Sequence, residues 1–225
     1  TPVVWTLADM NAFTGGCHYS QGCEGFRGDC RACPLTGGSA QMHDFWQVKR
    51  AALSGLSNLH VVCPSEWLAR QARDSALLGD RPVHMIPNAL PVTRFVPHNR
   101  LVARQRLGLP LDRRLVLFGA EALDNRRKGG DLLRDSLALL AGQGRLRDTE
   151  ALVFGDTPID LGLHMHSMGR AASDEKLALI YAAADVFAFP SNADNAPLTV
   201  IEALLCGTAV VGFDVGNVGE LLCHG

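Results

Sequence analysis

Apolar residues in this chain form two kinds of pattern, short continuous runs and longer stretches with helical spacing. The continuous runs predict strands at residues 1–7, 58–63, 83–86, 115–120, 151–155, 165–169, 186–189 and 208–213, and we expect those at 1–7, 115–120 and 186–189 to be buried. The periodic stretches predict helices at residues 45–56, 65–78, 101–107, 132–140, 174–184 and 197–205. Strands that alternate with helices favour an α/β fold with parallel sheets and right-handed crossovers.

Several polar residues and glycines sharpen the ends of these helices. Ser65 is suited to cap a helix that starts at Glu66. Pro197 suits the first helical position, where its missing N–H costs nothing, and Gly207 is placed to end that helix in the left-handed conformation. In the helix at 45–56 we expect the apolar side to carry Phe45, Val48, Leu53 and Leu56.

A proline-rich stretch at residues 87–100 predicts a boundary between two domains, which we place at 1–92 and 93–225. The chain lacks an initiator Met and starts inside a predicted strand, and its last residues resemble the start of another element. We therefore expect a fragment that lacks both ends of a longer protein, with an incomplete amino-terminal domain.

The composition argues against two classes of partner. The chain has 21 basic and 23 acidic residues and a net charge of −2, which does not favour nucleic-acid binding. None of its apolar runs approaches the roughly 20 residues that a membrane-spanning helix needs. The chemistry of the chain therefore has to be sought in particular clusters of residues.

The first cluster is a loop rich in glycine and cysteine, residues 14–38, hereafter the cysteine loop. It carries four of the seven cysteines with the spacing C-x5-C-x6-C-x2-C, namely Cys17, Cys23, Cys30 and Cys33. Thiolates gathered in a loop with little core of its own predict a structural tetrahedral Zn²⁺ site. Two disulfides, which an oxidising compartment would favour, or four free thiols are the alternatives.

The second cluster follows the strand at 186–189. Asp194 lies in the loop and Glu202 inside the next helix. Ligands of open α/β sheets bind at the carboxyl ends of the strands, and a helix that begins there attracts phosphate. Carboxylates around such a phosphate can accept hydrogen bonds from sugar hydroxyls, so the arrangement suits a nucleotide sugar. The alternative is a turn residue and a solvated helix position.

The third cluster is a basic loop after the strand at 115–120. It contains Arg126, Arg127 and Lys128, followed by Gly129 and Gly130. Arginine and lysine at a strand's carboxyl end can hold a diphosphate, and the glycines let the backbone approach a ligand closely. The alternative is a solvated run of charge.

Six motifs, met in order along the chain, together resemble the retaining glycosyltransferases of family 4, the group-1 glycosyl transferases with the GT-B fold. Within that family they are most similar to a branch that assembles bacterial polysaccharides. The motifs are Trp5-Thr6-Leu7-Ala8-Asp9-Met10 with 13–19, residues 64–68, Ile86-Pro87-Asn88, Arg127-Lys128-Gly129, residues 190–202, and 206–208 with 214–216.

The resemblance implies two Rossmann-like domains and a site that binds the donor mainly through the second. Glu202 would bind the donor ribose, Asp194 the transferred sugar, and Arg127 with Lys128 the diphosphate. The implied catalytic residues are Asp9, Arg127, Lys128 and Asp194. The implied donor site comprises Gly119, Arg126, Arg127, Lys128, Gly169, Asp194, Asn195, Leu198, Thr199 and Glu202. Because cations would stabilise the leaving group, no catalytic metal is expected.

The implied reaction moves a sugar from a UDP- or GDP-sugar to a saccharide or lipid-linked acceptor. The implied location is cytoplasmic, with peripheral contact to the inner face of the membrane left open. Two positions depart from the family pattern: Asp194 stands where Glu is usual, and Ala8 where His is usual. The second departure motivates an alternative, a non-catalytic nucleotide-sugar-binding relative or partner subunit. An epimerase or phosphorylase on the same fold is a further alternative.

Overall fold

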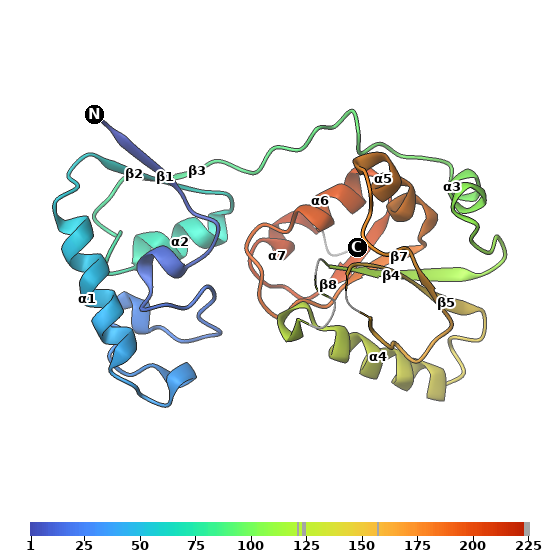
Figure 1. Ribbon diagram of the computed structural model, residues 1–225, viewed down its shortest axis with the longest axis horizontal. Helices are drawn as coiled ribbons and strands as arrows, with labels where there is room; N and C mark the ends of the chain where they lie inside the picture. Colours follow the sequence, from blue (N-terminus) through green and yellow to red (C-terminus); the bar gives the residue numbers. More distant parts are fainter. Residues whose placement is uncertain (121, 123–124, 157, 223–225) are drawn as a thin grey trace. The chain divides into compact units, whose positions relative to one another are not determined.

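The computed structural model describes residues 1–120, 122, 125–156 and 158–222 (Figure 1). By its contacts the chain divides into two compact units, and each is described by itself. The first unit comprises residues 1–88 with 193–196, and the second comprises 89–192 with 197–225. A short loop segment deep in the second half of the sequence thus groups with the first unit.

The first unit is built on a parallel three-stranded sheet with the order β1-β2-β3. Two helices, α1 and α2, connect these strands and pack with them into one apolar core. Three short 3₁₀ turns punctuate the long connection between β1 and α1. The elements are β1 (Val3–Thr6), α1 (Gln41–Ser54), β2 (Leu59–Cys63), α2 (Glu66–Asp74) and β3 (Val83–Met85).

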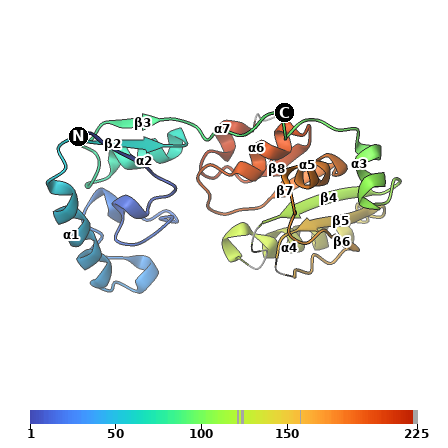
Figure 2. The same ribbon diagram turned by 45° about the horizontal axis from the view of Figure 1, so that its top comes forward.

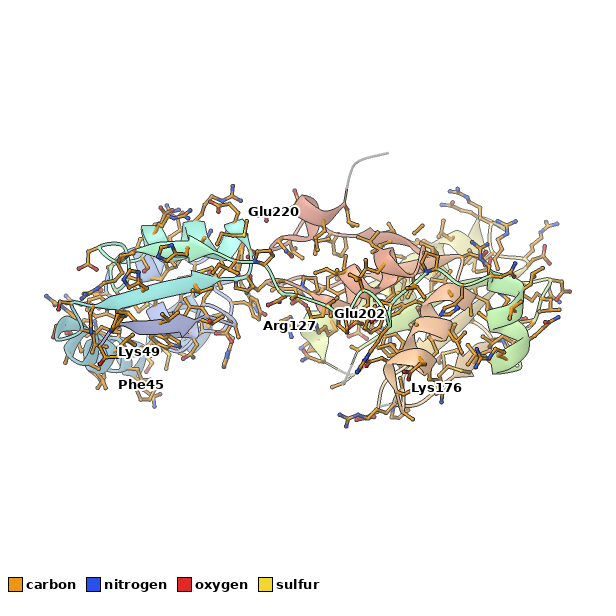
Figure 3. The ribbon with its side chains drawn as sticks, turned by 90° about the horizontal axis from the view of Figure 1, so that it is seen from above. Phe45, Lys49, Arg127, Lys176, Glu202 and Glu220 are labelled. Carbon is orange, nitrogen blue, oxygen red and sulfur yellow. The ribbon has the colours of Figure 1, made fainter. Side chains whose placement is uncertain are left out.

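Three sequence predictions fail in this unit. β1 is not buried: it is the edge strand of its sheet, and all four of its residues are exposed. In α1 the buried side chains are Trp46 and Leu53, whereas Phe45, labelled in Figure 3, and Val48 are exposed. Helix α2 ends at Asp74, whereas the predicted helix extended to residue 78. Its amino-terminal cap is the predicted one, because Ser65 Oγ accepts from Leu68 N–H at 3.0 Å.

The second unit is built on a parallel five-stranded sheet with the order β6-β5-β4-β7-β8. Its strands are β4 (Arg114–Gly119), β5 (Thr149–Phe154), β6 (Met165–Ser167), β7 (Val186–Phe189) and β8 (Ala209–Gly212). β4 pairs with both β5 and β7. The loops that follow β4 and β7 therefore leave the same edge of the sheet from neighbouring strands.

Helices cover both faces of this sheet (Figure 2). Alternate strand residues face opposite ways, so Leu117 packs toward α5 and α6, and Phe118 packs toward α4. The helices are α3 (Arg100–Leu107), α4 (Gly130–Gly142), α5 (Asp174–Ala183), α6 (Leu198–Leu205) and α7 (Val218–Leu221). This doubly covered parallel sheet confirms the predicted α/β class.

Small corrections concern the end of this unit. Pro197 is the residue before α6 and not its first helical residue, whereas Gly207 has the predicted left-handed conformation with φ +78°. The strand predicted at 208–213 is β8, an edge strand whose Val211 is exposed. Across the described part of the chain, no helix is both long enough and apolar enough to span a bilayer.

Candidate functional site

The basic loop has a fixed backbone at the carboxyl end of β4. Residues 125–130, hereafter the cationic loop, form a 3₁₀ turn at Arg126–Lys128, and the Asn125 side chain caps it by accepting from Arg127 N–H at 3.0 Å. Gly129 ends the turn with φ +74°, and α4 begins at the next residue. A Cβ on Gly129 would lie 1.9 Å from the carbonyl oxygen of Pro190, so only glycine fits there.

Hydrogen bonds join the cationic loop to the loop that follows β7. The Arg127 carbonyl accepts from Asn192 N–H at 3.0 Å and from Ser191 Oγ at 3.1 Å. Lys128 Nζ lies 5.8 Å from the centre of the Phe189 ring, at the end of β7. The structure thus brings together two segments about 65 residues apart in sequence, because β4 and β7 are neighbours in the sheet.

Glu202 projects from α6 into a buried position, 9% exposed. Its Oε2 accepts from the hydroxyl of Tyr181 on α5 at 2.8 Å. Burial raises the pKa of Glu202, and the hydrogen bond from Tyr181 opposes that rise. Burial together with the adjacent Glu202 carboxyl raises the pKa of Tyr181 well above its usual value, so the phenol stays a donor. Sequence reasoning missed Tyr181, since nothing in its surroundings marks it apart from the apolar helix around it.

The other predicted donor residues are distributed over both units. Leu198 is exposed and Thr199 half-buried, both in the first turn of α6. Asp194 and Asn195 group with the first unit, and Asp194 Oδ1 accepts from Asn195 N–H at 3.0 Å. Glu202, labelled with Arg127 in Figure 3, belongs to the second unit.

A pocket of about 260 Å³ lies at the carboxyl ends of β4 and β5, and sequence reasoning did not assign it. Gly119, where a Cβ would lie 2.0 Å from the Phe154 ring, directly precedes the lining residue Ala120, and Gly169, which has φ +61°, directly precedes the lining residue Arg170. The Arg170 guanidinium lies 3.5 Å from Asp156 at its rim. Gly169, directly before Arg170, was assigned to the donor site from the sequence, but none of the residues that line this pocket was. The lining residues are Ala120, Phe154, Gly155, Asp156, Arg170, Ala171 and Leu177.

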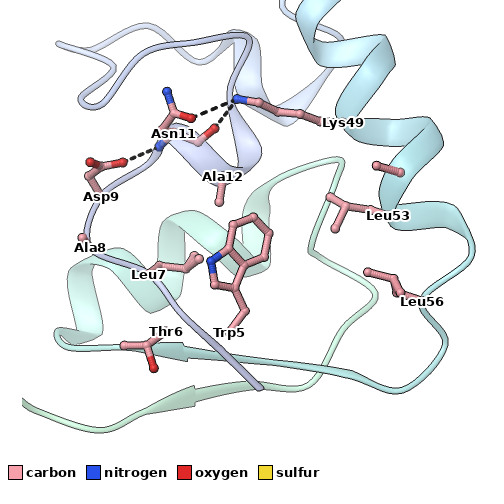
Figure 4. A pocket seen from close by; sticks show the side chains of 11 residues that line it. Trp5, Thr6, Leu7, Ala8, Asp9, Asn11, Ala12, Lys49, Leu53 and Leu56 are labelled. Atoms are coloured by element: carbon pink, nitrogen blue, oxygen red, sulfur yellow. Dashed lines mark hydrogen bonds between the residues drawn. The ribbon is translucent and has the colours of Figure 1, made fainter. Parts of the chain in front are cut away.

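In the first unit, Asp9 follows β1 and lines a pocket of about 450 Å³ (Figure 4). Its carboxylate accepts from Asn11 N–H at 2.7 Å and contacts His18 Nδ1 at 2.7 Å. Lys49, from α1, donates to the carbonyls of Asn11 at 2.5 Å and Thr14 at 3.0 Å. Burial lowers the pKa of Lys49. The pocket therefore presents a carboxylate and an amine beside the apolar surface of Trp5.

The four cysteines of the cysteine loop line one small cavity of about 20 Å³, and none of the four is paired in a disulfide. Burial, reinforced by the neighbouring cysteines, raises the pKa of Cys17 to about 11. For Cys33 burial acts in the same direction, but hydrogen bonds from Thr36, Leu35 and Cys17 outweigh it and lower the pKa. The four cysteines for which the sequence predicts a zinc site thus lie around one cavity.

Two parallel-sheet units, each with helices between its strands, are the architecture of GT-B glycosyltransferases. Residues 113–225 match the family described as glycosyl transferases group 1, and the chain belongs to this family. A D-inositol 3-phosphate glycosyltransferase of Xylanimonas cellulosilytica is 32% identical over 213 residues, which cover 78% of this chain and 49% of that protein. The putative teichuronic acid biosynthesis glycosyltransferase TuaC of Bacillus subtilis is 31% identical, over 61% of this chain and 34% of that protein.

Solved structures agree on the fold. Anabaena Alr3699/HepE, crystallised with UDP and glucose, superposes with a TM-score of 0.67 at 20% identity, over 100% of this chain and 56% of that one. A sucrose-phosphate synthase of Thermosynechococcus elongatus gives a TM-score of 0.64 at 24% identity, over 80% of this chain and 46% of that one. The chain spans about half the length of the curated relative reported first above.

Proposed function

We propose that the chain is part of a retaining glycosyltransferase that moves a sugar from a nucleoside-diphosphate donor to a saccharide or lipid-linked saccharide. The observation that carries the proposal is a pair of hydrogen bonds to the Arg127 carbonyl of the cationic loop. Asn192 N–H and Ser191 Oγ, in the loop after β7, donate them. These bonds fix the backbone that carries Arg127 and Lys128 at the sheet edge where α/β proteins bind nucleotides. UDP-glucose is the first donor to test, because the similar HepE structure was determined with it.

In this proposal each part of the donor meets a different group. Arg127 and Lys128 neutralise the charge that grows on the diphosphate as it departs, a task for which fixed cations suffice without a catalytic metal. Glu202, held through Oε2 by Tyr181, accepts from the ribose hydroxyls. Asp194 binds the transferred sugar, and Asp9 belongs to the acceptor side. The acceptor hydroxyl attacks on the face that the diphosphate leaves, so the anomeric configuration is kept.

The pocket beside Phe154 and Arg170 suits the nucleobase. Gly155 in its lining leaves room for a planar base, and the Phe154 ring supplies an apolar wall. The pocket lies at the carboxyl end of β5, next to the strand that carries the cationic loop. Gly119 and Gly169 therefore act through the shape of this pocket, since neither has a side chain to contact a ligand.

The experiment is a calorimetric titration of the chain with UDP-glucose and GDP-mannose, at low and at high salt. We expect Lys128→Gln to weaken donor binding about tenfold or more, because a charge-assisted hydrogen bond contributes about 1.5–3 kcal/mol. Arg147→Gln is the matched control. Arg147 is exposed just before β5, at the opposite edge of the sheet, and its loss should leave affinity unchanged.

Equal affinities for the Lys128→Gln variant and the unaltered chain would show that the cationic loop does not bind the donor. A second candidate function, a relative that binds nucleotide sugars without turnover, is favoured by Ala8 in place of the usual His. It predicts donor binding with neither transfer nor hydrolysis in the full-length protein across a panel of acceptors.

A further inference from the structure

We propose that Cys17, Cys23, Cys30 and Cys33 bind one Zn²⁺ ion, and that this ion fixes the cysteine loop against the wall that carries Asp9 and Lys49. The inference concerns a metal site in the first unit, whereas the cationic loop belongs to the second unit. It stands or falls independently of the donor assignment, because its readout is metal content.

The first argument is the surroundings of the sulfur atoms. All four cysteines line the same small cavity. Backbone N–H groups point at the sulfurs: Gly15 donates to Cys30 Sγ at 3.2 Å, and Gly25 donates to Cys23 Sγ at 3.3 Å. Hydrogen bonds to ligand atoms orient them and stabilise their charged form, so this pattern suits thiolates that hold a metal.

The second argument is backbone conformation. Two non-glycine residues have positive φ in the described part of the chain, Gln21 at +49° and Cys30 at +53°, and both lie in the cysteine loop. Such conformations persist only when their surroundings impose them. The loop has only short 3₁₀ turns and few apolar anchors, of which Phe26 is one. Four metal–sulfur bonds would supply the constraint that the loop's own core does not.

A second group of metal-type ligands must be weighed against the cysteines. Glu150, His164 and His166 have ligand atoms that all lie within 4.8 Å of one another. Among the described residues, no three of the four cysteine sulfurs lie that close together. An ion pair explains the Glu150 group without a metal, because His166 Nε2 lies 2.7 Å from Glu150 Oε2. Arg113 also approaches Glu150, at 3.5 Å, and its positive charge disfavours a cation there. His164 is exposed.

The cysteine loop is bound to the pocket of Figure 4 on two sides. His18, next to Cys17, contacts Asp9 at 2.7 Å, and its carbonyl accepts from Met10 N–H at 3.0 Å. Lys49 donates to the Thr14 carbonyl at 3.0 Å. A zinc ion in the loop would therefore hold Asp9 in place through His18, which makes it a positioning element for that wall.

The test is the zinc content of the purified full-length chain, prepared with reductant and without chelator or added metal. We expect about one zinc per chain, released by a thiol-blocking reagent. Cobalt exchanged into the unaltered protein should give sulfur-to-cobalt charge-transfer bands and the strong visible bands of a tetrahedral site. This spectrum keeps the proposal testable even if a cysteine variant fails to fold.

The variants separate the two ligand groups. Cys23→Ser and Cys33→Ser should lose the zinc. Cys206→Ala, a buried cysteine outside the cluster, and the double variant His164→Ala with His166→Ala should keep it. Zinc that disappears only with the histidines would overturn the proposal. So would a metal-free protein in which the four thiols titrate freely or are paired as disulfides.

Discussion

The cysteine loop and the cationic loop solve the same problem in opposite ways. Each must hold polar chain in one conformation so that its side chains can act. The cationic loop has a strand before it, a helix after it and a neighbouring strand's loop beside it, so backbone hydrogen bonds fix it. The cysteine loop spans 25 residues between β1 and α1 and contains only 3₁₀ turns. Its conformation depends on the four converging cysteine side chains, on the contact between His18 and Asp9, and on the hydrogen bond from Lys49 to the Thr14 carbonyl.

The comparison shows that the two loops should fail differently. A loop fixed by a sheet should keep its fold when one side chain is lost, at a cost of about 1 kcal/mol for a capping residue, because the strands still position its ends. A loop fixed by a few converging side chains loses its structure when their common partner is removed. Four experiments, from the largest expected effect to the smallest, separate these cases.

Removal of zinc should have the largest effect. A strong chelator should make the cysteine loop sensitive to a protease, with cuts inside residues 14–38, because the bound ion contributes directly to the folding of such a loop. The second unit should stay resistant under the same digestion, and added zinc should restore protection. Unchanged cleavage after chelation, checked by mass spectrometry, would mean that the two loops are fixed by similar means.

Gly129→Ala tests the cationic loop at its tightest point. The new Cβ would meet the Pro190 carbonyl at 1.9 Å in a backbone with φ +74°. A left-handed alanine alone costs about 1–3 kcal/mol, and the clash adds to it. The unfolding temperature of the second unit should fall accordingly. In Gly142→Ala, at the end of α4 with open space around it, stability should be unchanged or rise by up to about 1 kcal/mol.

Asn125→Ala separates loop geometry from loop charge. The Asn125 cap of the cationic loop and the Asn99 cap of α3 each accept backbone N–H groups at 3.0 Å. Loss of either cap should lower stability by about 1 kcal/mol. Only Asn125→Ala should also weaken UDP-glucose binding, measured by calorimetry, although both variants keep every charge. Equal donor affinity in the two variants would show that the capped geometry is not needed for binding.

Glu202 should give the smallest effect, a change in how stability depends on pH. Burial raises its pKa in the folded chain, so the folded state holds this proton more tightly than the unfolded state does. Its contribution is fully present below the ordinary carboxyl pKa and is lost as pH rises through the raised value. Glu202→Gln should flatten this part of the stability profile. Tyr181→Phe should move it to higher pH, because the Tyr181 hydrogen bond lowers the pKa of Glu202.

Sequence reasoning found elements better than it found faces. The runs at 59–63, 115–119 and 151–154 became strands because β-branched and leucine side chains were continuous there. The same reasoning called β1 buried, although it is an edge strand whose four residues are exposed. Apolar composition reports that a residue can be buried, whereas the position of its strand in the sheet decides whether it is. In α1 the prediction likewise placed Phe45 on the apolar side, whereas Trp46 is the aromatic residue that is buried.

The candidate site divides along the same line. Local sequence was enough to select Arg126, Arg127, Lys128 and the four cysteines, because their charge or sulfur chemistry is visible in the residue type. Tyr181 and the pocket beside Phe154 were not visible, since a phenol in an apolar helix and a gap between strand ends have no local signature. The contact of Tyr181 with Glu202 arises only when α5 packs on α6, and the pocket arises only when β4 and β5 pair in the sheet.

The sequence by itself therefore determined the alternation of strands and helices, the cap at Ser65, the turn at Gly207 and the family to which the chain belongs. Each of these depends on neighbours within a few residues or on motifs kept in order. The tertiary structure alone decided that the Arg127 carbonyl meets Ser191 and that Glu202 lies against Tyr181. Those contacts depend on the order of strands in the sheet, which long-range packing selects and no local pattern encodes.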